Sequence, residues 1–348
     1  MIKETSLGKL ARTALLAVAG LAFAGHATAQ AKVKIGVIGA VSDSAFYIAD
    51  AKGYFKQEGI DAEIISFPNS AQMIAPLGAG QIDVAAGATA AGLYNSIARG
   101  IDIKIVADKG SMPAGKGYMP LLVRKDLVDS GKYKSFKDMK GMKFGSQSPG
   151  GAALSTLNEA LKKGDVSYKD VSVVYMGHSQ LAMALQNKAL DAAFVTEPNA
   201  TRVIQSGSAV RVAEGDAVYP GQQLAVVLYG GAFIKKDPAV ARKVMRAYIR
   251  AARDYNDAIK GGKLVGPKAD EIINILTQAT AEKDAAIYKL MTANGCDPNG
   301  RVDMASLKRD YQFFKEQGLL TGEVDVDKVV DQSFADAVVK ELGPYKAM

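Results

Sequence analysis

The stretch KFGSQSPGG, residues 143–151, precedes a segment whose apolar residues recur with the period of a helix. Three leucines in residues 152–163 are spaced three and four positions apart, which predicts an amphipathic helix there. Ser148 is expected as its N-cap and Pro149 as its first residue. The stretch thus predicts a strand, a tight loop and a helix whose first amides can hold an anionic or carbonyl-bearing ligand. An ordinary helix start is the alternative.

The N-terminal part of the chain contains a divergent copy of this unit. Residues 33–37 predict a strand, 45–57 a helix and 62–67 a second strand. Segments 77–83 and 185–191 both run from Leu to Asp, at an offset of 108 residues. Two similar βαβ lobes each present loops at the carboxyl ends of their strands, so the predicted ligand site is the cleft between them.

The first 31 residues have the layout of a secretory signal peptide. Three basic residues precede an apolar run at 14–24, and small residues allow cleavage after Ala29 or after Ala31. The run is too short to anchor the chain in a bilayer, and no cysteine follows it to carry a lipid. We therefore expect a periplasmic protein, with a retained N-terminal anchor as the alternative.

The composition of residues 32–348 excludes several classes of protein. Removing the leader takes away three basic residues and one acidic residue, so the net charge falls from +7 to +5. Basic and acidic residues are interspersed and aromatic residues make up 7%, which does not favour nucleic-acid binding. The single cysteine, Cys296, cannot form a disulfide within the chain. Cys296 and His178 lack metal-ligand spacing, so we expect no metal and no cofactor, and only an all-carboxylate site stays open.

Alternating strand and helix patterns predict an α/β fold of two lobes with mostly parallel sheets flanked by helices. We expect residues 32–120 and 229–348 in lobe 1 and residues 121–228 in lobe 2. Apolar runs at 121–124 and 224–229 are candidates for the two crossings of a hinge. The remaining chain is expected to pack on lobe 1 as helices, from 238 to the glycines at 261 and 262, then at 269–278, 282–292, 304–317 and 327–342.

The segment FYIADAKGYFKQEGIDAE, residues 46–63, resembles a signature of bacterial ABC-transporter solute-binding proteins of the nitrate, sulfonate, taurine and thiamine-precursor group. Segments 77–83, 100–106, 136–145 and 190–198 are similar to the same group. The resemblance implies a type II periplasmic-binding fold that closes on a small solute like a venus flytrap. It also implies a protein that is not an enzyme and that delivers its solute to an ABC permease in the inner membrane. Because the sequence has no heptads and no long apolar surface run, we expect a monomer.

By position, the resemblance implies ligand contacts from loops of both lobes: Ser42, Asp43, Ser44, Phe46, Asn69, Thr89, Ser148, Gly150, Gly151, His178, Thr196 and Glu197. Structural alternatives stay open, namely helix caps for Ser42, Asp43, Asn69 and Ser148, a strand end for Glu197 and a solvated loop for His178. The expected solute is a sulfonate, nitrate, an aromatic acid or a pyrimidine. Because Asp43 and Glu197 would repel a bare anion, a solute with an amine, an amide or a ring N–H is also considered.

A secreted α/β hydrolase is the competing function. Ser146, Ser148 and Gly150 nearly match the Gly-x-Ser-x-Gly nucleophile motif, and His178 is a candidate base for Ser148. The motif needs an oxyanion-hole N–H on the residue after the serine, and Pro149 has none. The sequence therefore favours a binding protein.

Overall fold

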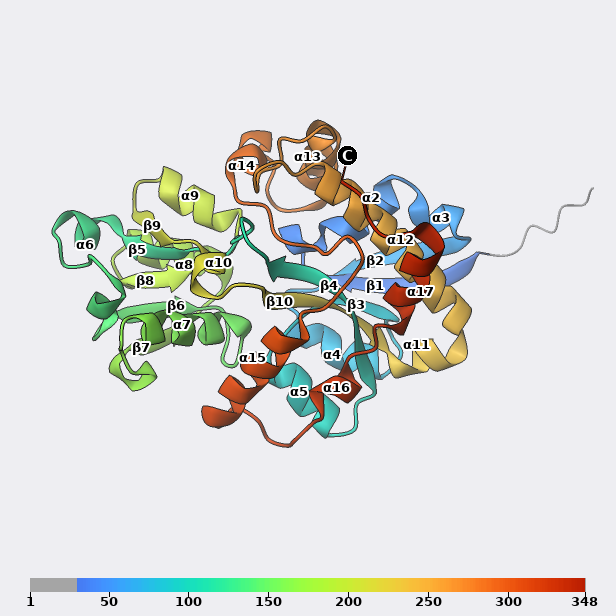
Figure 1. The fold of residues 1–348 in the computed structure, drawn as a ribbon, viewed down its shortest axis with the longest axis horizontal. Helices are drawn as coiled ribbons and strands as arrows, with labels where there is room; N and C mark the ends of the chain where they lie inside the picture. The colour runs from blue at the N-terminus through green and yellow to red at the C-terminus, as the bar shows by residue number, and fades with distance from the viewer. Residues whose placement is uncertain (1–29, 348) are drawn as a thin grey trace, which may run out of the picture.

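The computed structural model describes residues 30–347, which fold around two five-stranded sheets (Figure 1). The first sheet has the order β2 (Ile60–Ser66), β1 (Ala31–Val37), β3 (Val84–Ala88), β10 (Gln222–Gly230) and β4 (Ile103–Met112). The second has the order β7 (Ser172–Tyr175), β6 (Lys143–Ser146), β8 (Ala192–Phe194), β5 (Leu121–Arg124) and β9 (Ala209–Ala213). We call each sheet with its helices the first and the second lobe. The expected two-lobe α/β fold is confirmed.

Both sheets are mixed rather than mostly parallel. Strands β1, β2 and β3 run parallel, as do β6, β7 and β8. Strand β10 is antiparallel to β3 and β4, and β5 is antiparallel to β8 and β9. Strands β5 and β10 are the ones through which the chain enters each sheet from the other lobe, and they run opposite to the parallel strands.

Helices cover both faces of each sheet. Those on the first sheet are η1 (Val41–Asp43), α2 (Ser44–Ala51), α3 (Tyr54–Gln57), α4 (Ala71–Gly78), α5 (Ala91–Ala98), α11 (Gly231–Lys236), α12 (Pro238–Asp257), α13 (Ala269–Ala279), α14 (Ala285–Leu290), α15 (Met304–Glu316), α16 (Val326–Val329) and α17 (Ser333–Leu342). Those on the second are α6 (Lys125–Asp129), η2 (Phe136–Met139), α7 (Ala152–Lys163), η3 (Tyr168–Asp170), α8 (His178–Gln186), α9 (Asn199–Gln205) and α10 (Gly215–Val218).

Asp83 and Asp191, which occupy equivalent positions in the two copies of the predicted repeat, make the same type of hydrogen bond. Asp83 accepts a hydrogen bond from the backbone N–H of Lys34 in β1 at 2.8 Å. Asp191 accepts one from the backbone N–H of Lys143 in β6 at 2.9 Å. In each lobe this carboxylate, just before β3 or β8, therefore ties the start of that strand to the neighbouring parallel strand.

Two linkers, residues 113–120 and 214–221, join the lobes. The first follows β4, and the second precedes β10, which pairs with β4 along its length. Residues 222–228, expected in the second lobe, thus hydrogen-bond in the first sheet. The expected crossings at 121–124 and 224–229 are displaced, because those apolar residues fill sheet positions and the linkers precede them.

Helices α12, α13 and α15 begin at the expected residues 238, 269 and 304, whereas α14 begins at 285 instead of 282, and the C-terminal helices do not all pack on the first lobe alone. Asp237 accepts a hydrogen bond from Val240 N–H at 3.0 Å, and α12 starts at Pro238. Helix α15 contacts α7 of the second lobe as well as β10. Its position below the junction is visible in Figure 1.

Residues 1–29, on which the predicted signal peptide falls, lie outside the described residues, as does residue 348. Across residues 30–347, no helix combines the length and the apolar character needed to cross a membrane.

Candidate functional site

The carboxyl ends of the parallel strands of the two sheets face each other. Ala91 N–H, after β3, donates to the carbonyl oxygen of Gly150, after β6, at 2.9 Å. Ala90 and Gly151 form an isolated antiparallel bridge. Since β1 ends beside β3, and β8 beside β6, the loops of all four strands converge at this junction. The strand pattern and the repeat had predicted a site here.

A buried ion pair lies on the first-lobe side of the junction. The Lys109 ammonium lies 2.5 Å from an Asp43 carboxylate oxygen and 3.1 Å from Ser42 Oγ. The side chains of Lys109 and Asp43 are at most 1% exposed. Backbone N–H groups of Ile38 and Ala40 donate to the other oxygen of Asp43. The charge of Asp43 is therefore neutralised inside the protein, and the repulsion expected of it does not act on a solute.

Three further residues predicted to contact the solute instead bond or pack within the first lobe. Thr89 Oγ1 donates to the carbonyl oxygen of Gln223 at 2.8 Å and is fully buried. Asn69 Oδ1 accepts from Gln72 N–H at 3.1 Å, as the helix-cap alternative expected. The ring of Phe46 lies in the core, 4.8 Å from the ring of Tyr248. These contacts hold the loops in place.

Glu197 joins the two lobes. Its carboxylate accepts hydrogen bonds from Arg211 Nη2 at 2.6 Å, from Thr201 N–H at 2.8 Å and from Thr292 N–H of the first lobe at 3.3 Å. Its side chain is 1% exposed. The negative charge of Glu197 is thus also paired, through a cation 14 residues further along the chain.

The loop before α7 differs from its predicted form. The N-cap of α7 is Gly151 rather than Ser148, and the helix begins at Ala152 rather than at Pro149. Gly150 has φ of 70°, the left-handed conformation that glycine adopts without strain. This turn reverses the chain before the helix starts, so Ser148 is left exposed.

Thr196 is half-buried and precedes the cis Glu197–Pro198 bond. His178 is the first residue of α8, and the structure does not describe its side chain.

Two buried serine hydroxyls at the junction have no hydrogen-bond partner within the described protein. They are Ser44 Oγ, at the start of α2, and Ser146 Oγ, at the end of β6. Ser44 is 0% exposed and Ser146 3%. A buried hydroxyl without a partner costs about 1–3 kcal/mol, which a ligand oxygen or nitrogen can offset. Ser44 was predicted as a contact. Ser146 was considered only within the hydrolase motif, although its place as the last strand residue was a usable signal.

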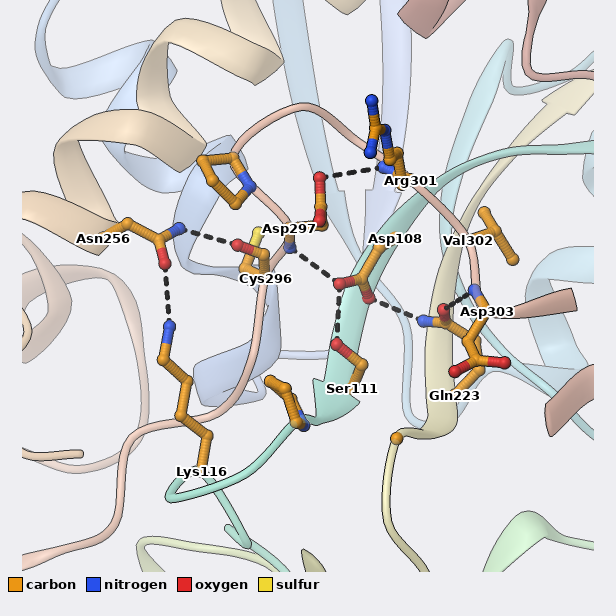
Figure 2. A pocket seen from close by; sticks show the side chains of 13 residues that line it. Asp108, Ser111, Lys116, Gln223, Asn256, Cys296, Asp297, Arg301, Val302 and Asp303 are labelled. Carbon is orange, nitrogen blue, oxygen red and sulfur yellow. Dashed lines mark hydrogen bonds between the residues drawn. The ribbon is translucent and has the colours of Figure 1, made fainter. Parts of the chain in front are cut away.

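A cavity of about 300 Å³, the hinge cavity, lies where the linkers leave the first sheet (Figure 2). Its polar lining includes Asp108, Ser111, Lys116, Gln223, Asp297 and Asp303. None of the predicted contacts lines it. Burial raises the pKa of Asp108 to about 6, and its carboxylate accepts from Ser111, Gln223 and Asp297 N–H. Lys116 donates to Asn256 at 2.8 Å. Figure 2 shows the bonds of Asp108 to Ser111, Gln223 and Asp297 and, separately, that of Lys116 to Asn256.

The described residues provide no catalytic arrangement around a thiol or a metal. Burial raises the pKa of the Cys296 thiol to about 12, which disfavours the reactive thiolate. Within residues 30–347, no group of three or more His, Cys, Asp or Glu side chains is placed to hold a metal ion. Ser148, the nucleophile of the hydrolase alternative, is exposed on its loop.

Comparison with known proteins gives a family and several relatives. A family model described as NMT1/THI5 like matches residues 42–258, more than half of the chain. A Brucella abortus (strain 2308) protein with the provisional name of a binding protein is 26% identical over 228 residues. That match covers 61% of this chain and 62% of the relative, so the chain spans less than two thirds of the length of the curated relatives it matches.

Solved structures share the fold. The aliphatic sulphonate binding protein SsuA of Escherichia coli gives a TM-score of 0.70 at 19% identity, covering 86% of this chain and 92% of SsuA. The nitrate-binding protein NrtA of Synechocystis PCC 6803 gives 0.72 at 15% identity, covering 90% and 89%. The desulfurization enzyme DSZB gives 0.61 at 14% identity, covering 89% and 99%. The same fold thus occurs in binding proteins and in an enzyme.

Proposed function

The chain belongs to the NMT1/THI5-like family, and from this premise we propose that it is the solute-binding component of an ABC importer. It captures a small organic solute or oxyanion between its lobes and delivers it to a permease in the inner membrane. The proposal includes a periplasmic, monomeric protein without catalytic activity. The raised pKa of the buried Cys296 thiol and the missing N–H of Pro149 after Ser148 support binding over catalysis.

The observation that carries the proposal is the pair of buried hydroxyls without a partner in the described protein, Ser44 Oγ at the start of α2 and Ser146 Oγ at the end of β6. One comes from each lobe, and the loops beside them are in contact through Ala91 and Gly150. A solute that accepts hydrogen bonds from both hydroxyls would satisfy them and join the lobes. Closure of the lobes would then follow from binding.

The chemistry of the junction favours a solute with acceptor oxygens. Asp43 is paired with Lys109 and Glu197 with Arg211, so neither carboxylate repels an oxyanion. The two hydroxyls, with backbone amides, are donors suited to sulfonate, nitrate, carboxylate or pyrimidine oxygens. The binding of a sulfonate by SsuA and of nitrate by NrtA, stated in their names, agrees with this class.

A thermal-shift screen of the exported protein tests the proposal. The probes are alkanesulfonates, nitrate, aromatic acids, pyrimidines and amino acids. A solute at 100 times its dissociation constant adds about 2.7 kcal/mol to the stability of the folded state. We expect one of the first four classes to raise the melting temperature. A screen in which none of these classes shifts it would contradict the proposed solute chemistry.

A further inference from the structure

A buried polar network fastens α7 of the second lobe to the hinge strand and to α15. Ser155 Oγ donates to Asp310 Oδ1 at 2.6 Å, and Gln222 Nε2 donates to Asp310 Oδ2 at 3.3 Å. Gln222 Nε2 also donates to the carbonyl oxygen of Ala152 at 3.0 Å, and Thr156 Oγ1 donates to Gln222 Oε1 at 2.5 Å. Ser155, Thr156, Gln222 and Asp310 are at most 1% exposed.

Apolar contacts surround this network and continue the core from one lobe into the other. Leu154 of α7 belongs to the same buried cluster as Tyr94 of α5 and Phe314 of α15. The rings of Tyr168, after α7, and Phe313, in α15, meet edge to face at 5.7 Å. The lobes therefore share a dry contact on this side, which we call the α7–α15 contact.

The opposite edge of the junction is built differently. There α9 of the second lobe meets the segment 280–292 of the first through the two-pronged ion pair of Arg202 with Glu282. Arg211 and Glu197 reach Thr292 with single hydrogen bonds. The carboxylates of Glu282 and Glu197 are 5% and 1% exposed. Their cationic partners, Arg202 and Arg211, are however 51% and 20% exposed and can be solvated in place. Among the described residues, no buried apolar cluster joins the lobes here, as one does around α7. We therefore expect this edge, the α9–α14 edge, to separate at lower cost than the α7–α15 contact.

We propose that Gln222 and Asp310 are positioning residues that keep α7 docked on the first lobe in both the open and the closed protein. The α7–α15 contact is then the pivot of the motion, and solute enters by separation of the α9–α14 edge. This inference rests on the proposed function, because it explains how the junction opens for a solute.

Two features indicate that the α7–α15 contact stays closed while the α9–α14 edge opens. Gln222 is the first residue of hinge strand β10, so displacement there is small for any rotation about the hinge. Opening the α7–α15 contact would also leave Asp310, Gln222 and Thr156 without their partners, each at the cost of a buried unsatisfied group. The same network fixes α7 from its first residue, Ala152, and therefore fixes the loop that carries Ser146 to Gly151.

The test measures distances between spin labels in the protein without added solute. One double variant, Lys162→Cys with Gln312→Cys, spans α7 and α15. The other, Gln205→Cys with Ala286→Cys, spans α9 and α14. All four positions are exposed, whereas the native Cys296 is 2% exposed and resists labelling. Because no solute is present, the outcome does not depend on identifying the solute.

We expect one narrow distance peak for the α7–α15 pair and an additional population, longer by more than about 2 Å, for the α9–α14 pair. Asp310→Ala should broaden the α7–α15 peak. Asp310→Asn should preserve it, because the amide oxygen can accept from Gln222 Nε2 and the amide NH2 can donate to Ser155 Oγ. Ser155→Ala, which removes one bond only, serves if Asp310→Ala does not fold. A longer population for the α7–α15 pair with a single peak for the other pair would overturn the proposal, as would equal behaviour of both pairs.

Discussion

The Asp43–Lys109 pair illustrates how single residues hold the junction in shape. Both side chains are withdrawn from water, and Asp43 also receives two backbone N–H groups from the loop that follows β1. Removing one member of a buried pair leaves the other charge without compensation. The pair therefore fixes the loop that leads to Ser44.

Lys109→Met should lower the free energy of unfolding by about 3–5 kcal/mol, because it leaves the Asp43 carboxylate buried without its cation. Urea denaturation measures this loss. Adding Asp43→Asn to Lys109→Met should recover part of it. The matched control is Lys315→Met, which removes an exposed ion pair with Glu323 and should stay close to wild type. Equal effects of Lys109→Met and Lys315→Met would contradict this account.

Asp310 should make the stability of the protein fall as the pH rises. Burial raises the pKa of Asp310 from its ordinary value of 3.8 to about 7, against hydrogen bonds from Ser155, Tyr219 and Gln222 and the charge of Arg309. Tyr94, the other titratable side chain facing it, stays protonated because burial raises its pKa. Between pH 4 and 7 the unfolded carboxyl ionises while the folded one stays protonated, so the folded state loses stability across this window.

The Asp310→Asn variant should not show this loss of folding stability between pH 4 and 7, because the amide does not ionise. The variant should match wild type near the low end of the window and exceed it above the folded pKa by roughly 2–4 kcal/mol. Denaturation series at several pH values give the comparison, with Asp108 titrating equally in both proteins. A wild-type curve and a variant curve that run parallel would show that Asp310 does not titrate in this way.

Long-range partners are the part of the site that sequence patterns did not predict. Lys109 lies 66 residues from Asp43, and nothing local to either residue indicates their pairing. Glu197 was expected to repel anions, but Arg211 from the next strand neutralises it. The hydrogen bond of Asn69 follows from cap chemistry, which depends on neighbouring residues only, and Ser44 stays a predicted ligand contact.

At the scale of elements, the loop before α7 decides how closely the lobes approach. A Cβ built on Gly150 would lie 2.8 Å from Ala91 Cβ across the junction, closer than side chains approach, and its φ of 70° strains any other residue. Gly177 precedes α8 in the same lobe, with φ of −64° and only Gln180 within 4 Å, at 3.7 Å. Gly177 therefore lacks both the positive φ and the close neighbour of Gly150, and serves as the unstrained control for substitution.

Gly150→Ala should destabilise the protein by about 1 kcal/mol or more and weaken solute binding, because the added methyl group separates the two loops. Gly177→Ala should change stability by less than about 0.5 kcal/mol. Thermal melts and calorimetric titrations of both variants supply the comparison. If Gly150→Ala behaves like Gly177→Ala, the contact between the loops does not determine closure.

Helix and strand periods predicted most elements, and the exceptions have tertiary causes. The expected helix 327–342 is interrupted between α16 and α17, where Val330 forms a bridge with Ile105 and Asp331 N–H donates to Ile105. The interruption depends on the edge of β4, which the local pattern does not contain. The N-cap of α7 moved from Ser148 to Gly151 for a similar reason, since Gly150 meets the other lobe.

At the scale of the whole molecule, the repeat and the motif pattern predicted the type II periplasmic-binding fold, and the two sheets with their structural neighbours confirm it. The α7–α15 contact was not predicted, because it joins segments about 155 residues apart and leaves no periodic signal in either. It changes the expected picture of two lobes held only by linkers. The lobes share a buried polar and apolar contact at one edge and are joined by ion pairs and hydrogen bonds at the other.

We propose that a solute binds between the lobes, beside Ser44 and Ser146, rather than in the hinge cavity. Calorimetric titration with the solute that gives the largest thermal shift compares Ser44→Ala, Ser146→Ala and Ser111→Ala. Ser111 is the control, because its hydroxyl donates to Asp108 at 2.7 Å in the hinge cavity. The account predicts at least about a tenfold loss of affinity, or 1.4 kcal/mol, for Ser44→Ala and Ser146→Ala and wild-type affinity for Ser111→Ala. Wild-type affinity in the first two variants with a loss in Ser111→Ala would contradict it and assign the solute to the hinge cavity.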